Sequence, residues 1–173
     1  MILWCKVCFN LRVKGRENIP KKGGFILASN HVSYLDPVML GASCPRRLNF
    51  MARSELFKHR FFGPFITGLG AFPVKRDSAD IGALKEALRR VKKGGCLVVF
   101  PEATRKTTTL DPDPKAGVGF IASKAHAPII PVYIKGAEKV LPKGAKRIKM
   151  SPISVTYGKE IHIERGMPYQ DVA

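Results

Sequence analysis

The chain has 173 residues, which is the size of one ordinary domain with a substantial hydrophobic core. Its composition, 45% hydrophobic and 25% charged, is typical of a globular protein and excludes a disordered tail. The 30 Lys and Arg residues outnumber the 13 Asp and Glu residues, so the net charge is +17. Such a surface attracts polyanions, and the charge alone does not choose among nucleic acid, anionic lipid and phosphorylated substrates.

The first eleven residues are mostly apolar but include Lys6 and Asn10. This stretch is shorter than the roughly 20 apolar residues that a membrane-spanning helix needs, and no basic segment precedes it as in a signal peptide. We expect either a half-inserted anchor or a first strand. Cys5 and Cys8 have the spacing of a zinc site, but no second pair complements them, so no metal site is expected there and the thiols should be reduced.

Apolar runs along the chain predict strands that alternate with helices. Strands are expected at residues 11–15, 25–28, 48–52, 96–100 and 129–134. Helices are expected from Asp36, from Ser54, over 81–93 and over 118–125. Alternation over 153–157 and 161–163 predicts a closing antiparallel ribbon at the C-terminus. The order predicts a single α/β domain over residues 1–173, with a mostly parallel central sheet flanked by helices.

More specific predictions concern the helix over 81–93 and the uncharged run 61–74. The helix over 81–93 should bury a face made of Ile81, Leu84, Leu88 and Val91, and the glycines that follow it should end it. Residues 61–74 contain no charged side chain and are expected to be mainly buried core. The alternative for that segment is an apolar groove or a membrane-facing patch.

The buried strand at 25–28 leads into a polar loop that contains His31 and Asp36. Asp36 is expected at the N-cap of the next helix, with Pro37 at its first position. A histidine can act as a base near neutral pH, and a neighbouring aspartate can fix its tautomer and stabilise its protonated form. From these two residues alone, a capping aspartate beside a solvated histidine is an equally good interpretation.

Two other polar clusters also follow predicted strands, one of which is formed by the last residues of the uncharged run 61–74. One strand ends at Lys75 and Arg76, and the other is followed by Glu102, Thr104 and Arg105. A guanidinium is well suited to phosphate, and a carboxylate beside it can hold a hydroxyl group. In parallel sheets ligands bind at the carboxyl ends of strands, where these clusters and His31 should lie. Each cluster by itself is also compatible with an ordinary solvated strand end.

Taken in order, these clusters resemble the sequence blocks of the glycerolipid acyltransferases, a family that includes lysophosphatidic acid acyltransferase. Asn30-His31 and Asp36 match the block Asn-His-x4-Asp. Residues 70–76 resemble the second block, residues 100–105 the third, and residues 129–132 the fourth. The resemblance covers residues 15–136. It departs from the family pattern at Ala103, where the family has Gly, and at Pro73, where it has an apolar residue.

The resemblance implies a 1-acylglycerol-3-phosphate O-acyltransferase that makes phosphatidic acid for phospholipid biosynthesis. His31 would take the proton from the acceptor hydroxyl, and Asp36 would orient and charge-balance the imidazole. The phosphorylated glycerolipid acceptor would be held by Lys75, Arg76, Glu102, Thr104 and Arg105. The co-substrate would be the thioester of acyl-CoA or acyl-carrier protein, with no metal or other cofactor. The enzyme would work as a peripheral or monotopic protein on an anionic membrane surface, at the cytoplasmic face.

Other functions remain open at this point. The acceptor could instead be glycerol 3-phosphate or another lysophospholipid, and a catalytically inactive protein of the same fold is also conceivable. The net charge of +17 makes a basic nucleic-acid-binding module the main alternative outside the enzymes. The basic residues are dispersed, however, and no known nucleic-acid-binding motif is present, so no nucleic acid is expected as a partner.

Overall fold

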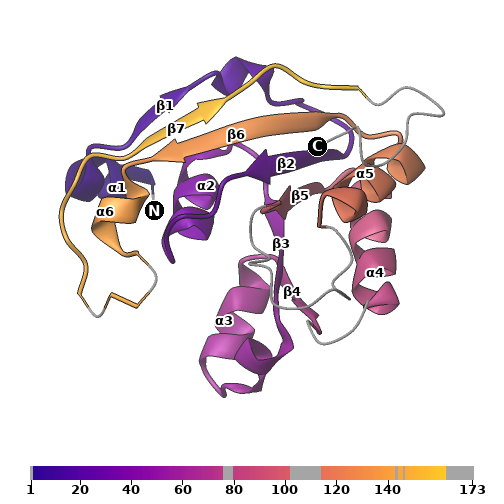
Figure 1. Cartoon of the computed structure of the whole chain (residues 1–173), viewed down its shortest axis with the longest axis horizontal. Helices are drawn as coiled ribbons and strands as arrows, with labels where there is room; N and C mark the ends of the chain where they lie inside the picture. Colours follow the sequence, from indigo (N-terminus) through magenta and orange to yellow (C-terminus); the bar gives the residue numbers. More distant parts are fainter. Residues whose placement is uncertain (1, 76–79, 102–113, 143, 146, 163–173) are drawn as a thin grey trace.

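The computed structural model describes residues 2–75, 80–101, 114–142, 144–145 and 147–162 (Figure 1). These residues form a seven-stranded sheet in the order β1-β7-β6-β2-β5-β3-β4. The strands are β1 (Arg12–Lys14), β2 (Phe25–Ser29), β3 (Leu48–Arg53), β4 (Ala71–Val74), β5 (Cys96–Val99), β6 (Ile129–Lys135) and β7 (Ser154–Tyr157). The helices are α1 (Ile2–Phe9), α2 (Asp36–Ser43), α3 (Phe62–Gly68), α4 (Ile81–Lys92), α5 (Pro114–Ala125) and α6 (Ala137–Val140). Short 3-10 helices lie at Arg16–Asn18 and Ser54–Lys58.

The sheet is mostly parallel, which confirms the predicted α/β class. β2 runs parallel to β5 and β6, and β3 runs parallel to β5 and β4. β7 is antiparallel to β6 and parallel to β1, so β1 and β7 run in the opposite direction to the other five strands. The carboxyl ends of β2, β5, β3 and β4 therefore meet at one end of the sheet.

The predicted C-terminal ribbon is present as an antiparallel pair, but its partners differ from those expected. In the described part of the chain, residues 153–157 and 161–162 do not pair with each other. β7 pairs with β6, and Ile161 bridges to Ile129 near the start of the same strand. Both stretches thus satisfy backbone groups along the outer edge of β6, which would otherwise be unpaired. Ile163 lies outside the described residues.

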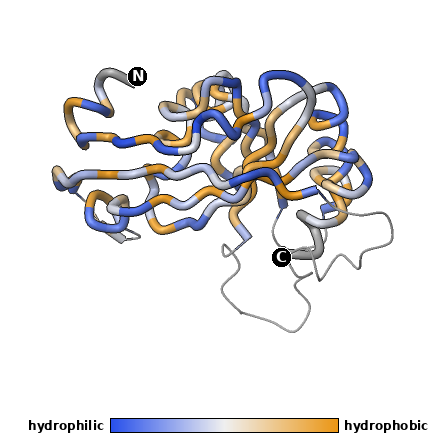
Figure 2. Tube along the Cα trace, turned by 90° about the horizontal axis from the view of Figure 1, so that it is seen from above, coloured by the Kyte–Doolittle hydropathy of each residue, from blue (hydrophilic) through white to orange (hydrophobic). Residues whose placement is uncertain are grey.

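Side chains along the central strands alternate between two hydrophobic cores. Phe25 and Leu27 of β2 pack with Met39 of α2 in one core. Ile26 packs with Ile121 of α5 in the other core, which also includes α4 side chains. Figure 1 shows α4 and α5 next to each other, and Figure 2 shows hydrophobic stretches running through the middle of the molecule. Helices on both faces explain why β5 is buried at every position.

The apolar N-terminal segment is a helix, so the expectation of a first strand was wrong. Cys5 and Phe9 lie four residues apart and are buried, and α1 contacts α2. Trp4 and Val7 on the other side are 52% and 78% exposed. The spacing of the buried pair is that of one helix face, which short-range alternation did not reveal.

The buried face of α4 is rotated relative to the prediction. Ala83, Ala87 and Val91 form the buried seam, whereas Ile81 is 63% exposed. The two alanines allow the helix to lie close to the sheet, so the larger Leu84 packs at the side of this contact and is only partly buried. The prediction gave too much weight to side-chain size.

The uncharged segment 61–74 is only partly core, and Gly63 and Ile66 of its first half are buried. Ala71 and Phe72 of β4 are buried as predicted. In and next to α3, by contrast, Phe61 and Phe65 are 83% and 61% exposed, so the interpretation as core was wrong for these aromatic side chains. No helix in the part of the chain that the structure describes has the length and apolar character needed to cross a bilayer.

Candidate active site

The loop after β2 is fastened to the neighbouring strand by a side chain that imitates a peptide group. The Asn30 amide Nδ2 donates to the carbonyl oxygen of Ile134, and its Oδ1 accepts from the backbone N–H of Ile134, both at 2.8 Å. At Asn30 the backbone stops pairing with β6, and the side chain makes the next two hydrogen bonds to that strand instead. His31 therefore starts from a fixed point at the carboxyl end of the sheet.

His31 and Asp36 form a hydrogen-bonded pair, as the sequence predicted. His31 Nδ1 lies 2.8 Å from Asp36 Oδ2. The aspartate is completely buried, whereas 33% of the histidine side chain is exposed. With Nδ1 facing the carboxylate, Nε2 is the nitrogen available to a substrate, and the described residues offer it no hydrogen-bond partner. A base oriented by a buried carboxylate is the arrangement that proton abstraction needs.

Asp36 does not cap the helix in the manner predicted. It is the first residue of α2, and its Oδ2 also accepts from the backbone N–H groups of Val32 and Ser33, at 2.7 and 2.8 Å. The carboxylate thus points back to the loop, because the loop amides and the imidazole together offer more donors than the first turn of the helix. Its other oxygen, Oδ1, is buried without a partner among the described residues.

Two further contacts hold the histidine loop in place. Ser33 Oγ donates to the Leu141 carbonyl at 2.7 Å, and the Tyr34 N–H donates to the same carbonyl at 3.2 Å. On the other side, the Phe100 ring stacks on the His31 imidazole at a centroid distance of 4.2 Å. Phe100 directly follows β5, the neighbour of β2 in the sheet. Two adjacent strands therefore lead into the histidine and the ring that stacks on it.

Lys75 lies at the same end of the sheet as His31 but is not its neighbour. The strand registers place Leu27 of β2 level with Ala71 of β4, so β4 ends about one residue beyond β2. Three strand spacings separate them, which is about 14 Å. Of the predicted acceptor-binding residues, Lys75 is exposed. The others lie outside the described residues: Arg76, Glu102, Thr104 and Arg105.

Asp80 was not predicted as a site residue, and in the chain it directly follows residues 76–79, which include Arg76. Asp80 Oδ2 accepts from the Lys75 N–H and Oδ1 from the Ala83 N–H, both at 2.9 Å. These backbone donors hold the pKa of the Asp80 carboxyl below its ordinary value, with the Lys75 amide contributing most. An acidic residue just before an amphipathic helix is a capping signal that could have revealed it. Asn30 and Phe100 belong to the sequence blocks that resemble the family, but their contacts with Ile134 and His31 were not predicted.

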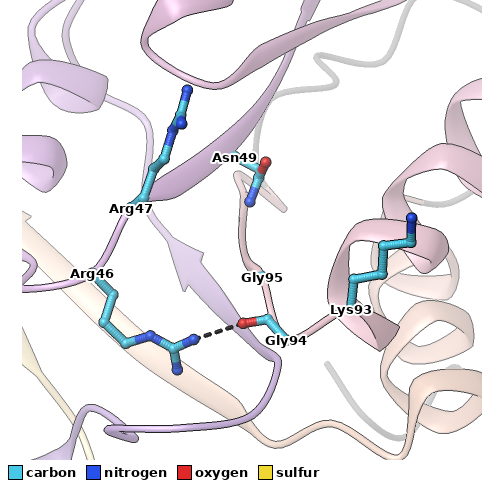
Figure 3. A pocket seen from close by; sticks show the side chains of 6 residues that line it. All are labelled: Arg46, Arg47, Asn49, Lys93, Gly94 and Gly95. Carbon is cyan, nitrogen blue, oxygen red and sulfur yellow. Dashed lines mark hydrogen bonds between the residues drawn. The ribbon is translucent and has the colours of Figure 1, made fainter.

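The opposite end of the sheet has a basic pocket that belongs to the scaffold. Its volume is about 410 Å³, and it is lined by Arg46, Arg47, Asn49, Lys93, Gly94 and Gly95 (Figure 3). Figure 3 shows the Arg46 and Arg47 side chains pointing in opposite directions. Arg46 donates to the carbonyls of Pro20, Gly23 and Gly94, at 2.6–3.0 Å. Its guanidinium therefore binds the backbone of the surrounding loops.

The cysteines are all free thiols, and no cluster of three or more His, Cys, Asp or Glu that could bind a metal ion occurs among the residues that the structure describes. Cys5 is buried in the core and Cys8 is half-buried, and burial raises the pKa of the Cys5 thiol. Cys44 and Cys96 are hydrogen-bonded thiols, and this bond lowers the pKa of Cys44 to about 7. This contact follows from the packing of the end of α2 on the start of β5, which the sequence did not indicate.

Comparison with known proteins places this geometry in a family. A family model described as Acyltransferase matches residues 10–135. The chain is 30% identical over 162 residues to the 1-acyl-sn-glycerol-3-phosphate acyltransferase of Bacillus subtilis, covering 91% of this chain and 78% of that protein. It is 31% identical over 166 residues to the enzyme of that name from Streptococcus pneumoniae, covering 94% of this chain and 60% of that protein.

A solved structure agrees with these sequence relatives. The crystal structure of the 1-acyl-sn-glycerophosphate acyltransferase PlsC from Thermotoga maritima superposes with a TM-score of 0.73 at 28% sequence identity. The match covers 96% of this chain and 66% of the Thermotoga chain. The segment matched by the family model contains the His31–Asp36 pair, β2, β5 and Phe100. The chain belongs to the acyltransferase family.

Proposed function

We propose that this acyltransferase moves a fatty acyl group from the thioester of acyl-CoA or acyl-carrier protein to the free hydroxyl of 1-acyl-sn-glycerol 3-phosphate (lysophosphatidic acid), giving phosphatidic acid. The observation that carries the proposal is the buried Asp36 carboxylate 2.8 Å from His31 Nδ1, within the segment that matches the family. The names of the Bacillus, Streptococcus and Thermotoga relatives support this acceptor.

The first step is proton abstraction and attack. His31 Nε2 takes the proton of the acceptor hydroxyl while the hydroxyl oxygen forms a bond to the thioester carbonyl carbon. The imidazolium that results is stabilised by Asp36, whose Oδ2 is held in place by the Val32 and Ser33 amides. Because the base does not have to be assembled when substrate binds, less reorganisation accompanies the reaction.

The second step is collapse of the tetrahedral intermediate. The carbon–sulfur bond breaks, the new ester remains on the acceptor, and the thiolate leaves. The imidazolium returns its proton to the thiolate, which restores neutral His31 and releases a free thiol. The reaction needs no acyl-enzyme, and the proposed chemistry requires no metal or other cofactor.

The acceptor phosphate and glycerol are proposed to bind beyond the ends of β4 and β5. Lys75 and Arg76 follow β4, and Glu102, Thr104 and Arg105 follow β5. The cations would pair with the phosphate, and Glu102 and Thr104 would orient the glycerol hydroxyl toward His31. The net charge of +17 supports an anionic acceptor and an anionic membrane surface, which we place at the cytoplasmic face.

Acceptor choice is the sharpest test of this function. Purified protein is assayed with lysophosphatidic acid, glycerol 3-phosphate and lysophosphatidylcholine, each with acyl-CoA and with acyl-carrier protein. We expect turnover with lysophosphatidic acid and at least one donor, and His31→Ala serves as the matched blank. Turnover with glycerol 3-phosphate but not with lysophosphatidic acid would contradict the acceptor while leaving the family chemistry intact.

A further inference from the structure

A continuous apolar surface on and next to α3 is turned to solvent. Phe61, Phe65 and Leu69 recur at intervals of four residues, so they lie on one side of the helix. They are 83%, 61% and 44% exposed, and Phe62 beside them is 46% exposed. We call these four residues the α3 apolar face. Large apolar side chains gathered in one patch indicate an interaction surface.

The α3 apolar face is presented by a helix that is fixed to the rest of the protein. Gly63 and Ile66, on its other side, are buried. A Cβ atom on Gly63 would lie 2.5 Å from the Phe57 carbonyl oxygen, so glycine permits this close contact with the preceding 3-10 helix. Arg47 Nη2 donates to the Gly68 carbonyl at 3.1 Å. Figure 1 shows α3 projecting at the β4 edge of the sheet.

Cations directly precede this face in the chain. Lys58 and Arg60 directly precede it, and the Arg60 guanidinium lies 5.7 Å from the centroid of the Phe61 ring. In the sequence, no acidic residue occurs between Glu55 and Asp77. An apolar patch with cations at its rim fits a surface that is apolar inside and negatively charged outside.

The topology places the face beside the catalytic end. β3 ends at the same end of the sheet as β2, and the chain passes from there through Ser54–Lys58 into α3. The steps from β2 to β3 and from β3 to β4 run in the same direction across the sheet, so right-handed crossovers put α2 and α3 on the same face. His31, which precedes α2, and the start of α3 therefore point to one side of the molecule.

We propose that the α3 apolar face docks this enzyme on an anionic lipid bilayer. Phe61, Phe62, Phe65 and Leu69 enter the boundary between headgroups and acyl chains. Lys58 and Arg60 contact lipid phosphates at the same depth. The proposal deepens the proposed function, because it states how the active-site end is brought to an acceptor that resides in the bilayer.

A single tryptophan probe tests the contact directly. Trp4 is the only tryptophan, so Trp4→Phe combined with Phe61→Trp gives a chain that reports from position 61 alone. With vesicles containing phosphatidylglycerol, we expect a blue shift of emission and quenching by brominated acyl chains. The matched control carries Ile161→Trp in the same background, since Ile161 is 50% exposed and pairs with Ile129 at the start of β6, the other end of the sheet. Bound protein whose position-61 probe is neither shifted nor quenched would overturn the proposal.

Loss of binding gives the second measurement. Phe61→Ser with Phe65→Ser should lower the partition coefficient for these vesicles roughly tenfold or more, because two exposed rings lose their burial. Ile161→Ser should leave it unchanged. Unaltered binding of the double variant would contradict the proposal. A blue shift of the position-61 probe that depends on protein concentration without vesicles would also contradict it, because that result indicates a second copy on this face.

An acceptor with a short acyl chain, used as dispersed monomers, separates docking from chemistry. The double variant should match the wild type on this soluble acceptor and fall behind it on vesicle-embedded acceptor. Equal losses on both would overturn the docking role. If the wild type acylates neither form although the position-61 probe inserts into vesicles, the proposed function fails and the docking surface stands.

Discussion

The Phe100 ring lies stacked against the His31 imidazole, with centroids 4.2 Å apart and planes inclined by 22°. Asp36 restrains the same imidazole at one edge, through Nδ1. One contact therefore fixes the face of the ring and the other fixes its rotation. Because Phe100 contacts the imidazole of the proposed base, we propose that it is a positioning residue.

Replacing the ring should therefore impair turnover more than binding. Phe100→Leu keeps an apolar side chain but removes the stacking surface, and a small displacement of a base can cost up to about a hundredfold in rate. We expect kcat to fall at least about tenfold with little change in KM for either substrate. Steady-state kinetics with both substrates varied provides the measurement.

The conservative variant Phe100→Tyr separates positioning from general destabilisation. It retains the aromatic face and should recover most of kcat. If Phe100 only stabilised the fold, kcat of both variants would instead fall in proportion to the loss in melting temperature. Equal kcat for Phe100→Leu and the wild type would show that the stack does not position His31.

His31→Ala should abolish nearly all acyl transfer while the melting temperature stays close to that of the wild type. The imidazole is the proposed base, and a third of its side chain is exposed, so its loss leaves no large cavity. Circular dichroism melts and turnover assays on the same preparations check both parts. Substantial transfer by a folded His31→Ala variant would remove this residue from the mechanism.

Asp36→Asn should lower kcat and stability together. An amide can still accept from the loop, but it lacks the charge that stabilises the imidazolium. The buried carboxylate also accepts from Val32 and Ser33, and weakening such charge-assisted bonds costs about 1–3 kcal/mol. Urea unfolding gives the stability loss, and kcat at a temperature where the variant is folded gives the catalytic loss. A variant with wild-type kcat would contradict the proposed role.

Arg76→Ala and Arg105→Ala should raise KM for the phosphorylated acceptor far more than KM for the acyl donor. Removing a charge-assisted contact to phosphate costs about 1.5–3 kcal/mol, which corresponds to roughly 10- to 150-fold in binding. Varying each substrate at saturating levels of the other provides both constants. Equal increases for donor and acceptor would indicate that these arginines bind the donor phosphates or maintain the fold.

The parallel sheet and the His31–Asp36 pair could be predicted from the sequence for physical reasons. β2 and β5 are short apolar runs that are almost entirely buried, and each is followed closely by polar residues. That pattern locates the carboxyl end of a parallel sheet and therefore the site. His31 lies on the loop before α2, and Asp36 begins that helix five residues later, so their contact is local in the chain.

The features that could not be predicted depend on which of several possible partners a side chain contacts in the folded protein. Asp36 could have bonded forward to α2 or back to the loop, and the loop conformation decides this because it brings the His31 imidazole and two backbone N–H groups to one carboxylate oxygen. The aromatic residues of α3 look like core because hydropathy does not distinguish a ring buried in protein from one turned outward. The contact between Phe100 and His31 requires β5 to neighbour β2, which no local pattern specifies.

Glu86 should make stability depend on pH in the acid range. Hydrogen bonds from Arg89 and then Arg90 lower the pKa of its carboxyl from 4.5 to about 2. A carboxyl whose pKa is lower in the folded state adds stability above its unfolded pKa, and this contribution disappears as the pH falls from about 4.5 to about 2. With 30% of the side chain exposed, water screens the pairs, so the contribution should not exceed about 1 kcal/mol.

Glu86→Gln should therefore be less stable than the wild type at pH 7, and the difference should shrink below pH 4.5 and vanish near pH 2. Glu86 also holds Arg90, which donates to Asn49 Oδ1 and the Gly70 carbonyl and lies over the Phe72 ring, so the loss extends to the contact of α4 with β3 and β4. Urea unfolding at stepwise lower pH measures the difference, with exposed Glu17→Gln as control. A gap between Glu86→Gln and the wild type that persists unchanged to pH 2 would show that the carboxylate charge is not its source.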